Sequence, residues 1–236
     1  MPHNVSRGVR SRFARLVALL LLATLALQIS FAARIGLMRA VDPQSTTFQR
    51  SEAARLLRTQ GKILWSQQWT DYERISEHLK RAVIASEDAG FTRHGGVDWD
   101  ALEQAFARNQ RARGKLVGGS TITQQLAKNL FLAGERTLPR KAQELVLTLM
   151  LETLLSKRRI LEIYLNNVEW GEGIFGAQAA ARHYFHVDAG QLAPQQAAQL
   201  AVLLPAPKRF EKRPHSDYVL GRAGTVMARM PDVELP

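Results

Sequence analysis

The segment SEDAGFTRHGG, residues 86–96, places two adjacent acids, a phenylalanine and a histidine in one short stretch. Acids beside a histidine occur in metal sites, in catalytic sites built around one carboxylate, and in ordinary polar loops. The sequence has no HExxH-type spacing, and the pair His183 and His186 is more often incidental than a metal site. No metal ligands are therefore assigned, and the catalytic and structural interpretations of the segment remain.

Glu87 is the residue of this segment best placed for acid–base chemistry. A helical pattern of apolar side chains over 75–85 brings it to the C-terminal end of a helix. The partial negative charge of that helix end and the adjacent Asp88 both disfavour ionisation, so we expect a raised pKa that suits a general base. Phe91 would shield the carboxyl group, and His94 would form a hydrogen bond with it.

Two further acids, Glu144 and Glu152, lie about two turns apart on a long apolar helix expected at 139–156. Buried acids require a partner or a function. The structural interpretation is an ion pair between Arg140 and Glu144, which are four residues apart. The functional interpretation is that Arg140 and Lys141, in the first helical turn, dock an anion such as a phosphate.

The segment GGSTITQQLAKN, residues 118–129, predicts a tight turn followed by a helix. Ser120 or Thr121 can cap that helix, and Thr121 with Gln124 matches a capping box. Three polar side chains are then expected on the face opposite the core: Gln124, Gln125 and Lys128. Neighbouring amides suit the recognition of sugar hydroxyl and N-acetyl groups, whereas the structural alternative is an ordinary solvated face.

The composition limits the classes of partner. The 236 residues are 46% hydrophobic, include no cysteine and carry a net charge of +11. Such a chain can build a core, cannot form disulfides, and suits polyanionic partners, namely nucleic acid, anionic lipid or a diphosphate.

The N-terminal region predicts a membrane anchor. Residues 16–33 contain no charged side chain, and four arginines but no acid precede them within the first fifteen residues. This pattern keeps an N-terminus cytoplasmic and exports the rest of the chain, which argues against nucleic acid as a partner. A cleavable signal peptide is the alternative. The expected divisions are a basic tail at 1–15, the anchor at 16–36, a linker at 37–50 and one domain at 51–236.

The rest of the chain predicts a mostly α-helical domain with no sustained strand pattern. Ser51 is expected to cap a helix that Gly61 ends, and WSQQW at 65–69 is at most a short extended piece. A further helix is expected to start at Asp98 or Asp100 and to run through Arg113. Others are expected at 139–156, 157–166, 174–185, 194–204 and 216–230.

Five motifs in the order of the chain resemble those of the family 51 glycosyltransferases, which polymerise peptidoglycan. They are Glu87-Asp88-x-x-Phe91-x-x-His94-x-Gly96, GGSTITQQLAKN, Arg140-Lys141-x-x-Glu144 continuing to Glu152, Lys157-x-x-Ile160-Leu161-Glu162-x-Tyr164-Leu165-Asn166, and Gly173-x-x-Gly176-x-x-x-Ala180. Their order and spacing agree over about residues 70–210. We expect no transpeptidase domain, and the chain is similar to the monofunctional, membrane-anchored members of the family.

The resemblance implies a lysozyme-like helical head, a smaller membrane-facing jaw, and polymerisation of lipid II with inversion at the donor sugar. It implies that Glu87 is the general base and that Glu144 is a second essential acid at the donor diphosphate. It also implies a set of residues that bind the substrates. These are Asp88, Phe91, His94, Ser120, Thr121, Gln124, Gln125, Lys128, Asn129, Arg136, Arg140 and Lys141.

The expected partners are lipid II, the growing glycan strand and membrane lipid, and other cell-wall synthesis or division proteins are candidates. Mg²⁺ or another divalent cation is a candidate helper at the diphosphate, although no ligand cluster in the sequence requires one. The expected location is the inner membrane, with a single span and a periplasmic catalytic domain. Two positions depart from the family pattern, Thr148 where alanine is common and Gln196 where an acid is usual.

Two other functions fit parts of the same sequence. A lysozyme-like lytic enzyme would use Glu87 alone to cleave finished peptidoglycan. A membrane-tethered scaffold would only bind the wall or anionic lipid. The cations near Glu144 favour the transferase, because hydrolysis of a neutral glycosidic bond does not require a diphosphate clamp.

Overall fold

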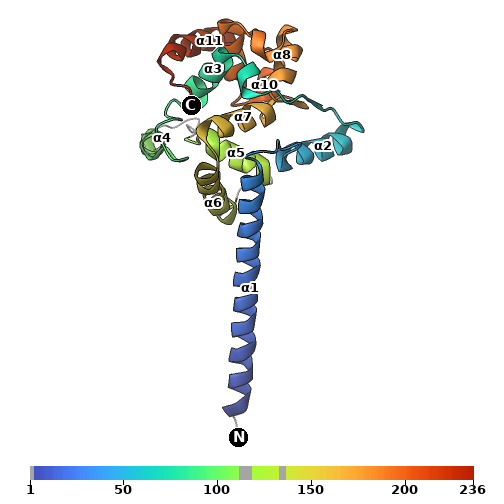
Figure 1. The fold of residues 1–236 in the computed structure, drawn as a ribbon, viewed down its shortest axis with the longest axis vertical. Coiled ribbons are helices and arrows are strands. Elements are labelled where there is room, and N and C mark those ends of the chain that lie inside the picture. The colour runs from blue at the N-terminus through green and yellow to red at the C-terminus, as the bar shows by residue number, and fades with distance from the viewer. Residues whose placement is uncertain (1–2, 112–118, 133–136) are drawn as a thin grey trace. The chain divides into compact units, whose positions relative to one another are not determined.

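The computed structural model describes residues 3–111, 119–132 and 137–236, and the chain divides into two compact units, 1–41 and 42–236. The first unit consists mainly of α1 (His3–Leu37), a single helix of 35 residues (Figure 1). Its segment Arg12–Leu37 is the one helix among the described residues that is long and apolar enough to cross a membrane. Its length and composition agree with the expected anchor.

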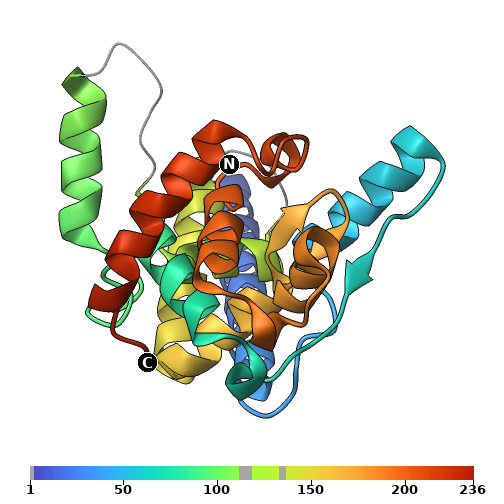
Figure 2. The same ribbon diagram turned by 90° about the horizontal axis from the view of Figure 1, so that it is seen from above.

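The second unit is mostly α-helical, as expected (Figure 2). Its helices are α2 (Thr47–Gln60), α3 (Glu77–Glu87), α4 (Trp99–Arg111), α5 (Ile122–Phe131), α6 (Leu138–Leu154), α7 (Lys157–Asn167), α8 (Ala177–Phe185), α9 (Pro194–Leu203), α10 (Pro207–Phe210) and α11 (Asp217–Arg229). Single turns of 3-10 helix are η1 (Tyr72–Arg74), η2 (Ala189–Gln191) and η3 (Met230–Asp232). Three short strands, β1 (Ser66–Gln67), β2 (Glu169–Gly171) and β3 (Ile174–Phe175), form a sheet in the order β1-β3-β2.

Local capping chemistry sets several of the helix ends. Thr121 and Gln124 form the expected capping box at the start of α5. The Thr137 hydroxyl accepts from the third residue of α6, whose first turn contains Pro139. Gly61 ends α2 in the left-handed conformation, with a φ of 68°. The groups of Thr121, Gln124, Thr137 and Gly61 each pair a backbone N–H or C=O group that the helix end would otherwise leave without a partner.

Two expectations about element boundaries are wrong. Helix α2 is capped by Thr46 rather than by Ser51, because Thr46 and Gln49 form a capping box five residues before the expected cap. The helix expected at 174–185 begins only at residue 177. Residues 174–175 pair with two other strands, and Gly176 follows with a φ of 81° and a backbone that lies against that of Asn166.

Most of the larger helices of the second unit pack in two groups, one of α3, α9 and α11 and the other of α2, α5, α6 and α7. Helix α9 lies between α3 and α11, and its alanines are fully buried, so the three backbones approach closely. Helix α5 contacts α2, α6 and α7. The C-terminal end of α3 meets the N-terminal end of α5, where the Ile122 N–H donates to Asp88. The segment 86–96 therefore lies where the two groups join.

Glu169 on β2 is a buried acid whose negative charge is only partly balanced by a nearby cation. It is 6% exposed, and its Oε1 lies 3.5 Å from the Lys208 ammonium, which also pairs with Glu52. Burial raises the pKa of Glu169 to about 7, with smaller contributions from Glu52 and Glu211, while Lys208 acts in the opposite direction. The folded protein therefore favours the protonated form of this side chain.

We expect Glu169→Gln to stabilise the protein at about pH 8 and to leave its stability unchanged at about pH 4. In the unfolded chain Glu169 loses its proton near 4.5, whereas in the folded state it does so near 7, so ionisation opposes folding as the pH rises through this window. The gain at high pH should be roughly 1–3 kcal/mol, measured by thermal unfolding across pH. Glu172→Gln is the control, because its pKa is lowered by the Arg55 hydrogen bond and its loss should give no gain. A stability difference that does not change with pH would contradict this account.

Candidate active site

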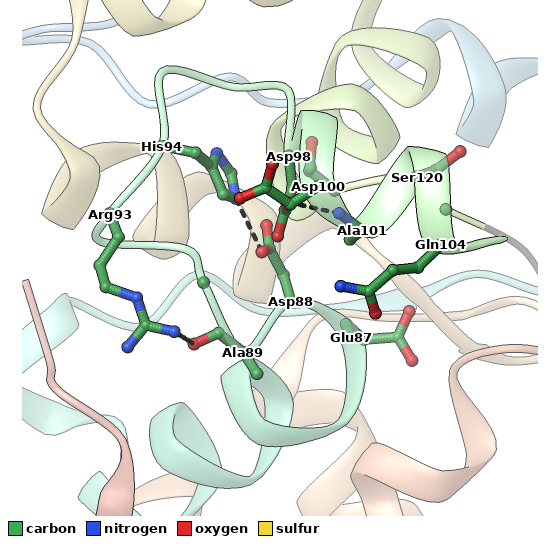
Figure 3. A pocket seen from close by; sticks show the side chains of 13 residues that line it. Glu87, Asp88, Ala89, Arg93, His94, Asp98, Asp100, Ala101, Gln104 and Ser120 are labelled. Atoms are coloured by element: carbon green, nitrogen blue, oxygen red, sulfur yellow. Dashed lines mark hydrogen bonds and ion pairs between the residues drawn. The ribbon is translucent and has the colours of Figure 1, made fainter. Parts of the chain in front are cut away.

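A polar cleft of about 450 Å³ lies at the C-terminal end of α3. Its walls come from residues 87–90, from the loop that carries His94, from the start of α4, and from Ser120. Figure 3 shows that Asp88 points toward His94, whereas the neighbouring Glu87 points away from both. The two adjacent acids therefore have different surroundings.

Glu87 is half-buried, and its Oε2 accepts a hydrogen bond of 2.9 Å from Gln125 Nε2 on α5. Burial raises the pKa of Glu87, and Asp88 adds to the shift, while the Gln125 hydrogen bond and Lys128 oppose it. The raised pKa was expected, but its main cause is removal of the carboxylate from water. A half-buried carboxylate with a raised pKa can remove a proton from a hydroxyl group.

Asp88 has a structural role beside Glu87. Its Oδ1 lies 2.8 Å from His94 Nε2, and its Oδ2 accepts from the Ile122 N–H at 3.0 Å. The expectation that His94 bonds to Glu87 is therefore wrong, because its ring is engaged by Asp88. Phe91 is fully buried, with the Lys157 ammonium 4.5 Å from its ring centroid, so it supports the loop from within.

One grouping among the described residues has the spacing of metal ligands. Atoms of Asp88, His94 and Asp98 lie within 4.8 Å of one another. Both ring nitrogens of His94 are already engaged, because Nδ1 accepts from the Gly96 N–H at 3.1 Å and Nε2 pairs with Asp88. Asp98 Oδ1 accepts from the Ala101 N–H and caps α4. The three side chains fit a hydrogen-bond network better than a metal site.

The second motif forms the other wall of the cleft. The Thr121 hydroxyl donates to the Gly96 carbonyl at 2.6 Å, which ties α5 to the loop after α3. Gln124 is buried, and its Oε1 accepts from the Thr121 N–H, so it serves the helix cap and does not share a polar face with Gln125. Ser120 is exposed at the cleft, whereas Asn129 is 8% exposed.

The third motif forms a cluster of cations around a buried acid. Glu144 is 4% exposed, and its two carboxylate oxygens accept from Arg140 at 3.1 Å and from Lys141 at 2.5 Å. The structural ion pair and the anion-binding interpretation therefore involve the same residues. Arg136 lies outside the described residues.

Lys128 on α5 links this cluster to Glu87 electrostatically. Its pKa is lowered first by desolvation of the ammonium and also by Arg140 and Lys141, while Glu144 and Glu87 act in the opposite direction. A cation near both acids can counter negative charge on either side of the site.

The sequence pattern left three contributors without a role. Tyr164 on α7 is fully buried and donates to Gln125 Oε1 at 2.9 Å. Glu152 Oε1 accepts from Thr123 at 2.5 Å and from Lys157 at 2.8 Å, which joins three helices. The motifs found in the sequence include Tyr164, Glu152 and Lys157. The sequence could not predict their contacts, because Glu152 and Thr123 are 29 residues apart, and Tyr164 and Gln125 are 39 residues apart. The contact of Lys157 with Glu152 depends on how the two side chains are oriented.

Residues 56–231 match a protein family described as Transglycosylase. A biosynthetic peptidoglycan transglycosylase of Burkholderia pseudomallei is 50% identical over 231 residues, which cover 98% of this chain and 90% of that protein. The protein of the same description from Burkholderia thailandensis is 51% identical over 215 residues, 91% of this chain and 84% of the relative. That of Bordetella avium is 52% identical over 199 residues, 83% of each.

Gly96 lies at the tightest point between the loop and α6. Its φ is 92°, and a Cβ there would lie 2.7 Å from Thr148 Cγ2 and 2.8 Å from Glu152 Cγ. Thr148, which departs from the family pattern, is fully buried against this glycine. A side chain at position 96 would therefore strain the backbone and displace α6.

We expect Gly96→Ala to destabilise the protein by about 2–4 kcal/mol and to lower its Tm by roughly 5–15 °C. Thermal unfolding followed by circular dichroism measures the change. Gly95→Ala is the matched control, since no atom lies within 4 Å of its Cβ position, and it should change stability by less than about 1 kcal/mol. Equal effects at the two glycines would show that the close packing is not what requires glycine.

Proposed function

The chain belongs to the transglycosylase family, and we propose that it polymerises lipid II into β-1,4-linked glycan strands with release of polyprenyl diphosphate. The observation that carries this proposal is the pairing of a half-buried acid of raised pKa, Glu87, with a cation cluster around Glu144. Lys128 interacts electrostatically with both. Such a site has one part for proton removal and another for a charged leaving group.

In the proposed reaction Glu87 removes the proton from the 4-hydroxyl of the acceptor sugar. The oxygen then attacks the anomeric carbon of the donor strand and forms the new glycosidic bond. The bond from that carbon to the diphosphate oxygen breaks, and its electrons leave with the diphosphate. Attack opposite the leaving group inverts the configuration from α to β.

The diphosphate is countered by Lys128, Arg140 and Lys141, with Arg136 as a further expected contributor. Positive charges held in position stabilise a leaving group more as it gains negative charge than they stabilise the bound donor. Glu144 holds Arg140 and Lys141 through its two oxygens. The charge on the leaving group is thus met by side chains, and Mg²⁺ or another divalent cation stays a candidate helper at the diphosphate.

We further propose that α1 anchors the protein in the inner membrane, with the basic tail in the cytoplasm and the catalytic domain in the periplasm. This topology follows from the apolar length of α1 and from the arginines that precede it. It places the cleft on the side of the membrane where glycan strands grow. The partners are lipid II, the growing strand and membrane lipid, and other wall-synthesis proteins are candidates.

We expect Glu87→Gln to reduce lipid II polymerisation by at least about 10³-fold without loss of folding, because the amide cannot accept the proton. The assay follows strand growth from lipid II in detergent micelles. Glu77→Gln, the same change at an exposed acid on the same helix, is the control and should retain full activity. Retained polymerisation in Glu87→Gln would exclude this residue as the base. Solubilisation of finished peptidoglycan without growth on lipid II would indicate the lytic enzyme instead.

We expect Lys128→Ala to lower kcat/KM for lipid II by about 10²-fold, since it removes a charge beside the diphosphate. The loss should be smaller for a donor analogue that lacks the diphosphate. Lys62→Ala, at an exposed lysine after α2, should behave as the wild type. An equal loss with both donors would show that Lys128 does not act on the diphosphate.

A further inference from the structure

Three residues from three helices form a hydrogen-bond chain that ends at the proposed base. The Tyr164 hydroxyl on α7 donates to Gln125 Oε1 on α5 at 2.9 Å. Gln125 Nε2 donates to Glu87 Oε2 at the end of α3, also at 2.9 Å. Tyr164 is 0% exposed, and Gln125 is half-buried. Water therefore has little access to the inner end of this chain.

The chemistry of each group allows one orientation of the amide when Glu87 is ionised. A carboxylate only accepts hydrogen bonds, so the NH₂ group of Gln125 must face Glu87. The amide oxygen then faces Tyr164, whose hydroxyl must donate. The reverse orientation requires a protonated Glu87 and leaves the Tyr164 proton without its amide acceptor, a costly arrangement for a buried hydroxyl group.

Burial and the nearby acids keep the Tyr164 hydroxyl protonated, so that it remains a hydrogen-bond donor. Burial raises the pKa of Tyr164 well above its usual value, and Glu87 and Asp88 raise it further. The phenol therefore stays protonated throughout the range in which Glu87 titrates. The charged groups that act on Glu87 are Asp88, which favours its protonated form, and Lys128 on α5, which favours the ionised form.

We propose that Tyr164 is a positioning residue that fixes the orientation of the Gln125 amide, so that its NH₂ group donates to Glu87 and keeps the base ready to accept a proton. This inference rests on the proposed function of Glu87. Without the Tyr164 hydroxyl, either amide orientation leaves one end unsatisfied. The amide can then turn its oxygen toward Glu87, which favours the protonated carboxyl group.

The first test compares the pH dependence of lipid II polymerisation by the full chain and by Tyr164→Phe. In Tyr164→Phe the midpoint of the ascending limb of the kcat–pH profile should move to a higher pH by about 1 unit. At pH values below that midpoint, kcat should therefore be about tenfold lower than in the wild type. Activity on the plateau at high pH and KM for lipid II should change by less than about threefold. Tyr184→Phe is the matched control, because that hydroxyl donates to the Trp170 carbonyl at 2.9 Å and should leave the profile unchanged. A loss that is equal at every pH would overturn the proposal.

The second test asks whether Tyr164 acts through Gln125. Gln125→Met keeps the length of the side chain but removes the amide. It should shift the midpoint of the ascending limb to a higher pH by at least as much as Tyr164→Phe does. In the Gln125→Met background, Tyr164→Phe should cause no further shift. Additive shifts would show that Tyr164 affects Glu87 by another route.

A titration without substrate separates this proposal from the proposed function. Carboxyl-labelled glutamate in the full chain gives a ¹³C signal for Glu87, which the Glu87→Gln variant assigns. Its midpoint should rise in Tyr164→Phe and stay unchanged in Tyr184→Phe, whether or not the protein polymerises lipid II. An identical Glu87 midpoint in wild type and Tyr164→Phe would reject the positioning role. Polymerisation by Glu87→Gln would reject only the catalytic role of Glu87.

Discussion

A carboxylate that leaves water must be satisfied by neighbouring donors, and Asp88 meets this requirement by joining the two helix groups. It accepts from the first backbone N–H of α5, at Ile122, and from His94 in the loop after α3. His94 in turn accepts from the Gly96 N–H, and the Gly96 carbonyl accepts from Thr121. The loop after α3 is thus held to the start of α5 at two points, through Asp88 before the loop and through Gly96 within it. The residue before Asp88, the proposed base, is fixed by these contacts and faces α5.

The buried and half-buried acids around the cleft differ in how their charge is compensated. Glu144 has two cations, and Glu152 has a lysine and a threonine hydroxyl. Asp88 has a backbone N–H and a histidine. Among the described contacts, Glu87 is hydrogen-bonded only to the neutral amide of Gln125. Weak compensation leaves the proton affinity of Glu87 high, which suits this acid to proton transfer.

The sequence predicted several helix ends from local contacts, as at the capping box of Thr121 and at Pro139 in the first turn of α6. It missed the equally local capping box of Thr46 and Gln49, because Ser51 offered a competing cap. It predicted the position and the raised pKa of Glu87. It could not predict that Gln124 serves the cap while Gln125 faces the base, since both amides have similar chemistry and neighbouring positions. Contacts between distant segments, such as that of Tyr164 with Gln125, depend on how whole helices pack, which the spacing of residues does not encode.

Helix α5 connects the two halves of the proposed reaction. Gln125 and Lys128 are three residues apart on it and so lie on one face, one supporting Glu87 and the other influenced by both Glu87 and Glu144. Before reaction, the negative charge of Glu87 partly offsets the positive charge of Lys128. When Glu87 takes up the acceptor proton, it becomes neutral, and this offset is lost. In the proposed reaction the field of Lys128 would then act more fully on the diphosphate, at the stage when that group gains negative charge. Proton removal at one end of the site would therefore strengthen stabilisation of the leaving group at the other, without any movement of the helices.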